Sequence, residues 1–388
     1  MLAPKLRFKE FNDNYSTYKL KNIADFYKGN TLAKSDITPD GNIPCILYGE
    51  LYTKYSEITK QIFSYTNNKS KNLFYSKVND VLIPCSGETA LDISTSTCVL
   101  LDDVALGGDL NVLRPKNIDG RYLSYLLSNK KRITIAKYAQ GDSIVHLYAD
   151  KIKNISIILP CLDEQKKVSL LLELLNKKIE LQQRKIEVLK MYKRGLINKI
   201  FNIQYNNTSR LKDLIKEKSI RNKENIVKEV YSVNNKCGFI LQAEQFKDRE
   251  VASEDTSNYK IVQYNDFAYN PARINVGSIA RMKKYNKGII SPMYICFSCK
   301  ERLLPEYLEY YYDSEVFRHE MTKRLEGSVR MCLSYEAMIN IPLDLPKFEE
   351  QKRMTKVLVE IDNKIEKEET IYSAINRLKK GLLQKMFI

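Results

Sequence analysis

Apolar residues recur at steps of three and four along one stretch of the chain, between residues 168 and 200. They are Val168, Leu172, Leu175, Ile179, Ile186, Leu189, Leu196 and Ile200. This spacing is that of the a and d positions of a coiled coil. Acidic residues stand just after Pro160 and basic residues gather before Phe201, as the helix dipole favours. The pattern predicts one long amphipathic helix between these two residues.

The end of the chain repeats this stretch. Residues 346–387 align with residues 160–201 without a gap, and equivalent positions are 186 residues apart. The equivalent a and d positions are Met354, Leu358, Ile361, Ile365, Tyr372, Ile375, Leu382 and Met386. Both patterns are interrupted in the same two places, at Gln182/Glu368 and at Lys193/Lys379. Because the interruptions coincide, we predict that the two helices pair with each other rather than pack on separate domains.

Each predicted helix follows a segment of short strands, turns and a few helices. In the first segment we expect strands at 43–47, 80–84, 93–100 and 155–159, with helices at 18–24 and 121–127. Asn265–Asn270 aligns with Asn79–Pro84 at the same offset, although the loops of the two segments differ. The fold class is therefore α+β, with two diverged globular domains joined by the repeated helices. We predict domains at 1–159 and 207–345, with helices and linker at 160–206 and 346–388.

The net charge of +16 on 388 residues favours a polyanionic partner, with nucleic acid first and an anionic membrane surface second. No apolar run approaches the about 20 residues that span a bilayer, and no secretory segment follows Met1, so we expect a cytoplasmic protein and no membrane partner. The eight cysteines are scattered and predict reduced thiols. The one CxxC pair, Cys296 and Cys299, has no second pair nearby, and we expect no metal site.

If the helices pair antiparallel, the two globular domains sit at opposite ends of a rod. A basic rod of this kind can contact one DNA duplex at two separated half-sites. Since the two domains differ in their loops, we expect half-sites that differ in sequence.

Several motifs resemble the specificity (S) subunits of Type I restriction–modification systems. Both helices open with Pro-x-x-[Asp/Glu]-Glu-Gln-Lys, carry Lys-Ile-Glu in the middle and end with Gly-Leu-x-x-Lys-x-Phe. The opening Pro4–Phe8 and the segment Tyr269–Ile279 are also similar to the family. The resemblance covers essentially the whole chain.

The resemblance implies two target recognition domains, separated by an antiparallel helical spacer, each of which reads half of a bipartite asymmetric DNA sequence. It implies a chain without catalytic activity of its own. Two methyltransferase (M) subunits would use S-adenosylmethionine to methylate adenine at N6, and restriction (R) subunits would use ATP and Mg²⁺ to cleave unmodified DNA. We expect this chain itself to bind no cofactor.

Motifs for catalysis are weak in this sequence. Asn270-Pro271-Ala272-Arg273 lacks the second proline and the aromatic residue that hold a target amine in amino-methyltransferases. No phosphate-binding G-x-x-x-x-G-K-[ST] loop is present. Glu164 and Glu350 suit a helix's first turn and a subunit contact better than a nuclease site. We expect ordinary structural roles for His146 and His319, with no serine or cysteine constellation beside them.

Arginine, asparagine and glutamine are the expected base readers, while lysine, serine and threonine contact phosphates. The predicted DNA-binding residues are Lys69, Lys71, Ser86, Thr89, Ser143, Arg273, Asn275, Ser278, Arg281, Lys283, Lys284, Ser328 and Arg330. Gln165 and Gln351 are predicted contacts with a partner subunit, and a local capping role for them stays open.

Three alternatives remain open at this stage. The chain could serve a methylation-only system, which differs only in its partner genes. It could be a coiled-coil scaffold that binds RNA or ribosomes through charge, which a competition assay for sequence preference would distinguish. It could be a stand-alone enzyme, which methyl transfer without a partner would reveal.

Overall fold

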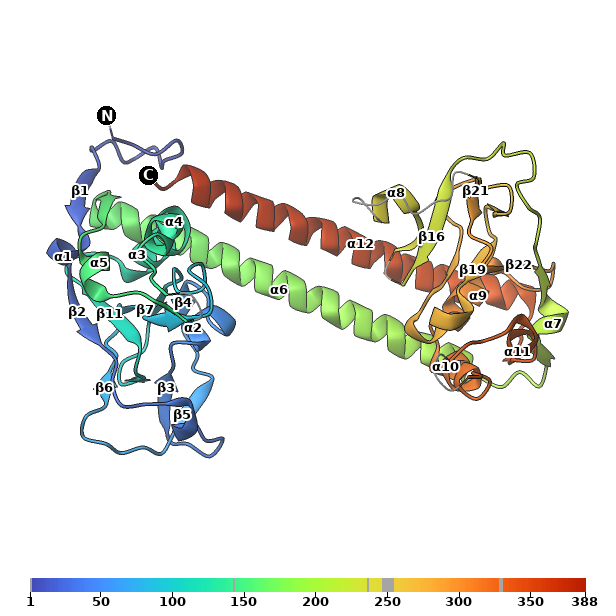
Figure 1. The fold of residues 1–388 in the computed structure, drawn as a ribbon, viewed down its shortest axis with the longest axis horizontal. Coiled ribbons are helices and arrows are strands. Elements are labelled where there is room, and N and C mark those ends of the chain that lie inside the picture. Colours follow the sequence, from blue (N-terminus) through green and yellow to red (C-terminus); the bar gives the residue numbers. More distant parts are fainter. Residues whose placement is uncertain (1, 142–143, 236, 246–254, 328–330) are drawn as a thin grey trace. The chain divides into compact units, whose positions relative to one another are not determined.

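The computed structural model describes residues 2–141, 144–235, 237–245, 255–327 and 331–388. The chain folds into two compact units, one of Met1–Gln183 with Thr370–Ile388 and one of Arg184–Glu369. We call them unit 1 and unit 2. The long helices α6 (Leu162–Phe201) and α12 (Phe348–Lys385) each contribute a part to both units. Figure 1 shows the order of the elements along the chain.

Unit 1 contains a five-stranded sheet in the order β2-β11-β7-β9-β4, a four-stranded sheet in the order β5-β3-β10-β6, and the pairs β1-β13 and β8-β12. Most pairings are antiparallel, whereas β3-β10 and β4-β9 are parallel. The strands are β1 (Ser16–Lys19), β2 (Ala24–Lys28), β3 (Ile43–Ile46), β4 (Ile58–Thr59), β5 (Ser64–Thr66), β6 (Phe74–Tyr75), β7 (Val81–Pro84), β8 (Ser86–Gly87), β9 (Thr97–Val99), β10 (Ala105–Leu106), β11 (Leu110–Pro115), β12 (Val145–His146) and β13 (Ser156–Leu159). The short helices are α1 (Leu20–Ile23), η1 (Lys34–Asp36), α2 (Glu50–Thr53), α3 (Gly120–Tyr125), the π-helical η2 (Leu126–Lys130), α4 (Arg132–Ala136) and α5 (Ala149–Lys153).

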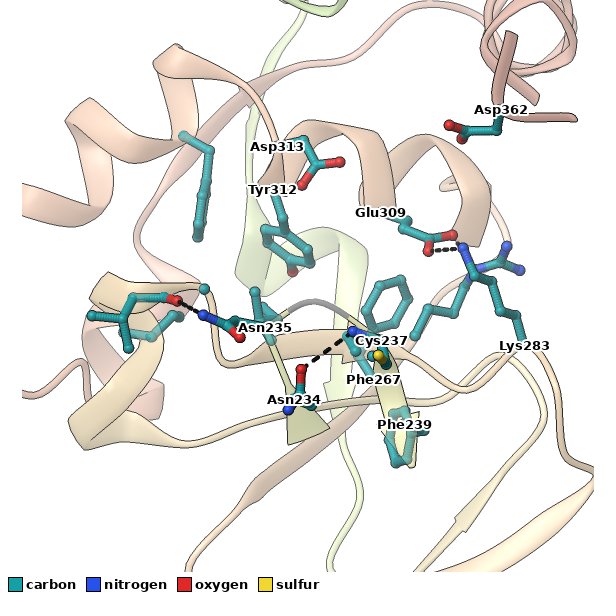
Figure 2. A pocket seen from close by; sticks show the side chains of 18 of the residues that line it. Asn234, Asn235, Cys237, Phe239, Phe267, Lys283, Glu309, Tyr312, Asp313 and Asp362 are labelled. Atoms are coloured by element: carbon teal, nitrogen blue, oxygen red, sulfur yellow. Dashed lines mark hydrogen bonds and ion pairs between the residues drawn. The ribbon is translucent and has the colours of Figure 1, made fainter. Parts of the chain in front are cut away.

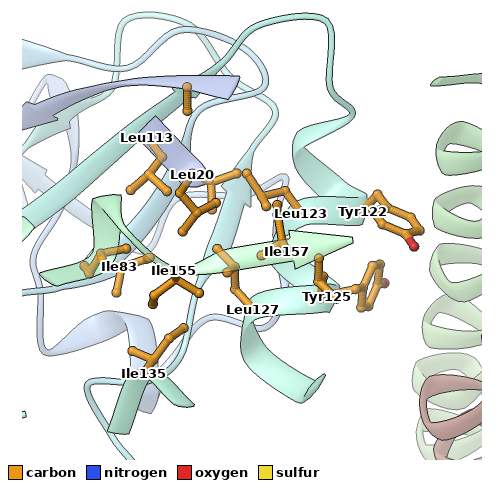
Figure 3. Packing of buried hydrophobic residues seen from close by; sticks show 14 of the residues in the cluster. Leu20, Ile83, Leu113, Tyr122, Leu123, Tyr125, Leu127, Ile135, Ile155 and Ile157 are labelled. Atoms are coloured by element: carbon orange, nitrogen blue, oxygen red, sulfur yellow. The ribbon is translucent and has the colours of Figure 1, made fainter. Parts of the chain in front are cut away.

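The main core of unit 1 lies between the five-stranded sheet, α3 and the long helices. Leu113 and Ile83 contribute from the sheet and Leu123 from α3, and all three are fully buried. Figure 3 shows Tyr122 and Tyr125 pointing away from this sheet toward the long helices. The Tyr125 hydroxyl accepts a hydrogen bond from the Asn176 side chain of α6 at 2.9 Å. The helices thus close one side of the domain.

Unit 2 repeats this plan with two four-stranded sheets, β15-β22-β19-β20 and β17-β16-β21-β18, and the pair β14-β23. Its strands are β14 (Thr208–Arg210), β15 (Ile215–Glu217), β16 (Val230–Asn234), β17 (Gly238–Leu241), β18 (Lys260–Gln263), β19 (Phe267–Tyr269), β20 (Ile279–Arg281), β21 (Lys287–Ile290), β22 (Ile295–Cys299) and β23 (Pro342–Asp344). Its short helices are α7 (Leu211–Leu214), α8 (Gln242–Gln245), η3 (Pro271–Val276), α9 (Pro305–Tyr312), α10 (Glu315–Thr322) and α11 (Tyr335–Ile339).

Each domain is completed by the end of the helix that belongs to the other repeat. In unit 1, Phe387 at the end of α12 packs on Tyr122, with ring centroids 4.8 Å apart. In unit 2, the equivalent Phe201 at the end of α6 packs on Tyr307 at 4.9 Å. The start of α6 lies in the same core as the end of α12, and the end of α6 in the same core as the start of α12. Within each unit the two helices therefore run antiparallel.

The predicted a and d positions lie on the inner faces of the helices. Eight of them are buried, with 8% exposure or less. These are Val168, Leu172, Ile186, Ile200, Leu358, Ile365, Ile375 and Met386. The others are half-buried, and none is exposed. Lys185 also forms an ion pair with the buried Glu368, at a position where the apolar pattern is interrupted, with 2.6 Å between Nζ and Oε1.

Local predictions in the first domain were partly wrong. Residues 18–24 form strand, four-residue helix and strand in place of one helix, because β1 and β2 find partners in β13 and β11. The strand expected at 93–100 is confined to Thr97–Val99. The helix at 121–127 begins one residue earlier and passes into the π-helical η2. These outcomes depend on pairing across the sheet, which local pattern does not display.

Candidate nucleic-acid interface

The repeated Asn-Asp dipeptide directly precedes a central strand in each domain, β7 in unit 1 and β19 in unit 2. Asn79 and Asn265 adopt left-handed backbone, with φ of 81° and 69°, a conformation that asparagine tolerates better than most residues. The carboxylate of Asp80 then accepts a hydrogen bond from the Lys77 N–H at 2.8 Å, and Asp266 accepts the equivalent bond from Gln263 at 2.7 Å. The asparagine and aspartate together form the turn that leads into β7 or β19, and the predicted DNA-binding loop follows at the other end of the strand.

Both aspartates are buried and neutralised by a cation. Arg114 donates two hydrogen bonds to Asp80, at 2.8 and 2.7 Å, and Lys218 approaches both oxygens of Asp266 at 2.8 and 2.9 Å. Asp80 and Asp266 are equivalent positions of the repeat, whereas Arg114 and Lys218 are not equivalent. Each ion pair holds the start of its strand against a neighbouring element. The backbone from which the following loop begins is therefore held in place.

In unit 2 the loop after β19 forms η3. The Asn270 side chain accepts a hydrogen bond from Ala272 N–H at 3.1 Å, and Gly277 ends the turn with φ of 86°. Arg273 and Asn275 are exposed on it. Ser278 is 5% exposed and its hydroxyl donates to the Val233 carbonyl, so this predicted DNA contact is occupied within the chain.

In unit 1 the corresponding loop begins with β8. The Ser86 hydroxyl lies 3.2 Å from Asp109 Oδ2 and 3.0 Å from His146 Nδ1. The expectation that His146 has no serine nearby was therefore wrong, because β12 pairs with β8 across 60 residues of sequence. Ser86 is 3% exposed and stands between aspartate and histidine, whereas a nucleophilic serine needs the histidine in the middle and an open face.

A hairpin docks on this loop in both domains. Leu147 N–H donates to the Cys85 carbonyl at 2.8 Å, and the equivalent Leu333 N–H donates to Pro271 at 3.1 Å. The hairpins close through the pairs Gln140–His146 and Glu326–Cys332. Gly141 and Gly327 have φ of 117° and 115°, a region that side chains with a Cβ avoid. Each domain thus presents the same surface, a loop and a hairpin, with different side chains.

Four of the predicted DNA-binding residues lie on these two loops. Ser86 and Thr89 lie on the loop of unit 1, and Arg273 and Asn275 on that of unit 2. The predicted residues Ser143, Ser328 and Arg330 lie outside the described residues.

The predicted lysines have different surroundings. Lys69 and Lys71 are exposed between β5 and β6, which belong to a different sheet from β7. Lys284 is exposed in the turn after β20, and its neighbour Lys283 pairs with Glu309 at 2.7 Å. These four side chains suit phosphate contacts, which carry no sequence information.

Arg281 does not fit the predicted role. It is 7% exposed, and its guanidinium donates to Glu306, to Glu309 at 2.9 Å and to Asn265 at 2.7 Å. Burial opposes its charge, but the Glu309 and Glu306 carboxylates outweigh burial and raise its pKa. A guanidinium held in this way joins β20 to α9 and is not available to a base.

Gln165 and Gln351 do not face a partner, since they are 1% and 0% exposed. The Gln165 carbonyl accepts from Asp119 N–H at 3.1 Å, and that of Gln351 accepts from Leu304 N–H at 2.9 Å. Their amide groups donate to the carbonyls of Pro160 and Pro346. These contacts support the local capping role that the sequence left open. Gln165 connects the start of α6 to the start of α3, and Gln351 connects the start of α12 to the start of α9.

Glu164, beside Gln165, has the predicted place in the first turn of α6 but does not face a partner subunit. Glu164 is fully buried, where it accepts two hydrogen bonds from Arg7, at 2.9 and 2.8 Å, and one from the Tyr15 hydroxyl at 2.9 Å. The predicted subunit contact through Glu164 is therefore wrong, and the N-terminal segment takes that place. Burial raises the pKa of the Tyr15 hydroxyl, and the Glu164 bond adds to that shift.

Among the described residues, no group of three or more histidine, cysteine or acidic side chains is arranged to hold a metal ion. Burial raises the pKa of the Cys296 and Cys299 thiols to about 12, which disfavours the thiolate that binds metals. The part of the chain that the structure describes also has no helix long and apolar enough to cross a membrane.

Known proteins resemble this chain in sequence and in fold. Residues 12–191 match the model of the family described as the Type I restriction modification DNA specificity domain. The Type I restriction enzyme MjaVIII specificity subunit of Methanocaldococcus jannaschii is 24% identical over 343 residues, which cover 79% of this chain and 77% of that protein.

Two solved structures share the fold. The crystal structure of a Type I restriction–modification S subunit from M. genitalium has a TM-score of 0.62 at 16% identity, over 100% of this chain and 99% of that one. A chain from a structure that describes complex assembly and conformational transition of the type I R-M system has a TM-score of 0.58 at 14% identity, over 96% and 97%.

Residues 12–191 thus match a Type I DNA specificity domain, and the two solved structures confirm the predicted fold class. The resemblance to Type I specificity subunits that the motifs predicted is therefore confirmed by comparison with known proteins.

Proposed function

We propose that the loop and hairpin of each domain read one half of a bipartite, asymmetric DNA sequence. The observation that carries the proposal is the repeated geometry of this surface within one chain, with Cys85–Leu147 and Pro271–Leu333 as equivalent backbone bonds and with different side chains around them. A common frame with different exposed residues suits two readers of different base sequences. The charge of +16 suits contacts with the phosphates of both half-sites.

The rest of the complex follows from this role. The chain would have no catalytic activity and bind no cofactor, and it would position two M subunits that methylate adenine N6 with S-adenosylmethionine. R subunits with ATP and Mg²⁺ would cleave DNA that lacks the methyl mark. The missing amino-methyltransferase and phosphate-binding motifs in the sequence agree with this division of labour.

Selection from a random duplex library tests the proposal. The full chain, with its M partner, is incubated with the library at physiological salt, and bound DNA is sequenced over several rounds. We expect one motif of two short half-sites separated by a fixed gap. Enrichment without a motif, together with equal competition by RNA, would instead favour the scaffold that binds nucleic acid by charge.

A further inference from the structure

Three polar side chains of unit 1 form a row that ends at the hairpin. The Ser86 hydroxyl lies between Asp109 Oδ2, at 3.2 Å, and His146 Nδ1, at 3.0 Å. The Asp109 backbone is held in turn by a hydrogen bond from Cys85 N–H to its carbonyl at 2.7 Å. His146 is the direct partner of Ser86 in the pairing of β8 with β12. The backbone therefore fixes the order of the three groups, to which the proposed function gives no role.

This order determines which nitrogen of the imidazole carries the hydrogen. A carboxylate only accepts hydrogen bonds, so the single hydroxyl hydrogen of Ser86 is donated to Asp109. The Ser86 oxygen then accepts from His146, and this requires the hydrogen of the neutral ring to be on Nδ1. Nε2 keeps its lone pair and is a hydrogen-bond acceptor.

The accepting nitrogen belongs to an exposed ring. Side chains of the hairpin strand alternate between core and solvent, as in any strand with one buried face. Val145 and Leu147 are buried. Ile144, His146 and Tyr148, at the alternate positions, are exposed. Nε2 has no hydrogen bond to any residue that the structure describes, and the ring stacks beside Tyr148 with 6.3 Å between the centroids. The acceptor is thus held in one orientation on the surface that we assign to DNA.

An exposed acceptor distinguishes between the groups of a DNA duplex. Phosphate oxygens have no hydrogen to donate, so they do not suit a neutral imidazole nitrogen that only accepts. In the major groove the amino groups at N6 of adenine and N4 of cytosine are donors. Thymine and guanine present carbonyl oxygens there, which are acceptors. The chemistry of Nε2 therefore favours adenine or cytosine.

We propose that His146 Nε2 accepts a hydrogen bond from the exocyclic amino group of one adenine or cytosine in the first half-site. Ser86 and Asp109 are positioning residues, because they keep this nitrogen an acceptor and hold the ring in place. Ser86 then acts on DNA through His146 and not by its own contact. The inference rests on the proposed function, which places this hairpin against DNA.

Unit 2 lacks this row of side chains. The equivalent positions of Ser86 and His146 are Ala272 and Cys332, which offer neither the hydroxyl nor the imidazole. The end of η3 is held by another contact, in which the Asn235 side chain donates to a backbone carbonyl of the loop at 3.3 Å (Figure 2). The proposed base reader therefore belongs to the first domain, in agreement with half-sites that differ in sequence.

The tautomer is tested by ¹⁵N NMR of the imidazole rings in the full chain. The chain has two histidines, so His319→Gln identifies the signals of His146. At about pH 8, where an ordinary imidazole is neutral, we expect the hydrogen of His146 on Nδ1 in the wild-type chain. Ser86→Ala should give a mixture of both tautomers. A hydrogen on Nε2 in the wild-type chain would overturn the proposal, because the exposed nitrogen would then be a donor.

Base analogues in the selected motif test the contact with DNA. Each adenine is replaced in turn by purine and each cytosine by 2-pyrimidinone, which removes only the exocyclic amine. At one position the wild-type chain with its M partner should bind about fivefold more weakly. His146→Ala, an exposed change, should bind the normal and the altered duplex equally at that position. His319→Gln, exposed in unit 2, is the matched control and should behave as the wild-type chain.

Failure of this proposal differs from failure of the proposed function. If the wild-type chain selects a split motif and His146→Ala is as sensitive as the wild-type chain to every analogue, His146 reads no amino group and the proposed function stands. If the wild-type chain selects no motif, the proposed function is refuted and the role of His146 with it.

Discussion

The Phe387 ring, one residue before the end of the chain, packs on Tyr122 in the first domain, with 4.8 Å between the ring centroids. Both side chains are buried, and Leu6 N–H donates to the Lys385 carbonyl beside them at 3.0 Å. The C-terminal residues are therefore part of the core of unit 1. The equivalent contacts of Phe201 with Tyr307 and Tyr311 belong to unit 2.

Removing this ring should destabilise one unit selectively. Phe387→Ala is expected to cost about 3–5 kcal/mol, because it leaves a cavity in a closed core. Hydrogen exchange of the full chain should show lost protection in unit 1 and little change in unit 2, and Phe201→Ala should show the reverse. Leu378→Ala, exposed on the same helix, is the control. Equal loss in both units after either change would contradict the assignment of the helix ends.

Replacing Gln351 should affect stability before it affects assembly. Gln351→Ala leaves the Leu304 N–H and the carbonyls of Arg302 and Pro346 without their partner, and we expect a loss of about 1–3 kcal/mol. Denaturant unfolding measures this loss, with the exposed Gln204→Ala as control. If M-subunit binding is lost while stability is unchanged, the glutamine contacts a partner after all.

The a and d positions of the long helices could be predicted from the sequence, whereas the role of Gln165 and Gln351 could not. The three- and four-residue spacing specified the long helices and their pairing because that pattern is local. The glutamines were also prominent, since they recur five residues after a proline in both repeats, but their role required the position of α3 and α9. The Ser86–His146 contact and the docking of the hairpins join residues about 60 positions apart, and nothing in a single sequence displays such pairings.

Acid should weaken unit 1 through Glu173. Burial opposes its ionisation, but Lys60 and Arg121 outweigh burial and lower its pKa. Because the folded pKa lies below the unfolded value, this stabilisation is complete above the unfolded pKa of about 4.3 and is lost as the pH falls through the folded pKa. Glu173→Gln should reduce the stability of unit 1 at pH 7 and flatten its decline below about pH 4.3. Thermal unfolding across this range is the measurement, with Glu180→Gln, exposed on the same helix, as control. If the stability of Glu173→Gln falls with decreasing pH as steeply as that of the wild-type chain, Glu173 does not cause the acid sensitivity of unit 1.

Loss of a base contact and loss of a phosphate contact in the second domain should change the salt dependence of DNA binding in different ways. Arg273→Ala is expected to cost about 1–3 kcal/mol on the selected sequence and to relax preference at a base pair of one half-site. Lys284→Ala should weaken binding to all sequences and reduce the slope of log K against log salt by about 1. Fluorescence anisotropy at several salt concentrations measures both. An Arg273 variant that loses affinity equally for every sequence would mean that Arg273 contacts only the backbone.

Methylome sequencing of the source cell, with and without this gene, tests the bipartite DNA specificity of the chain most directly. We predict that N6-methyladenine is lost from one split motif, two short and different half-sites with a fixed gap, and that the wild-type gene restores it. With an M partner shown to be expressed and active, an unchanged methylome would contradict this role.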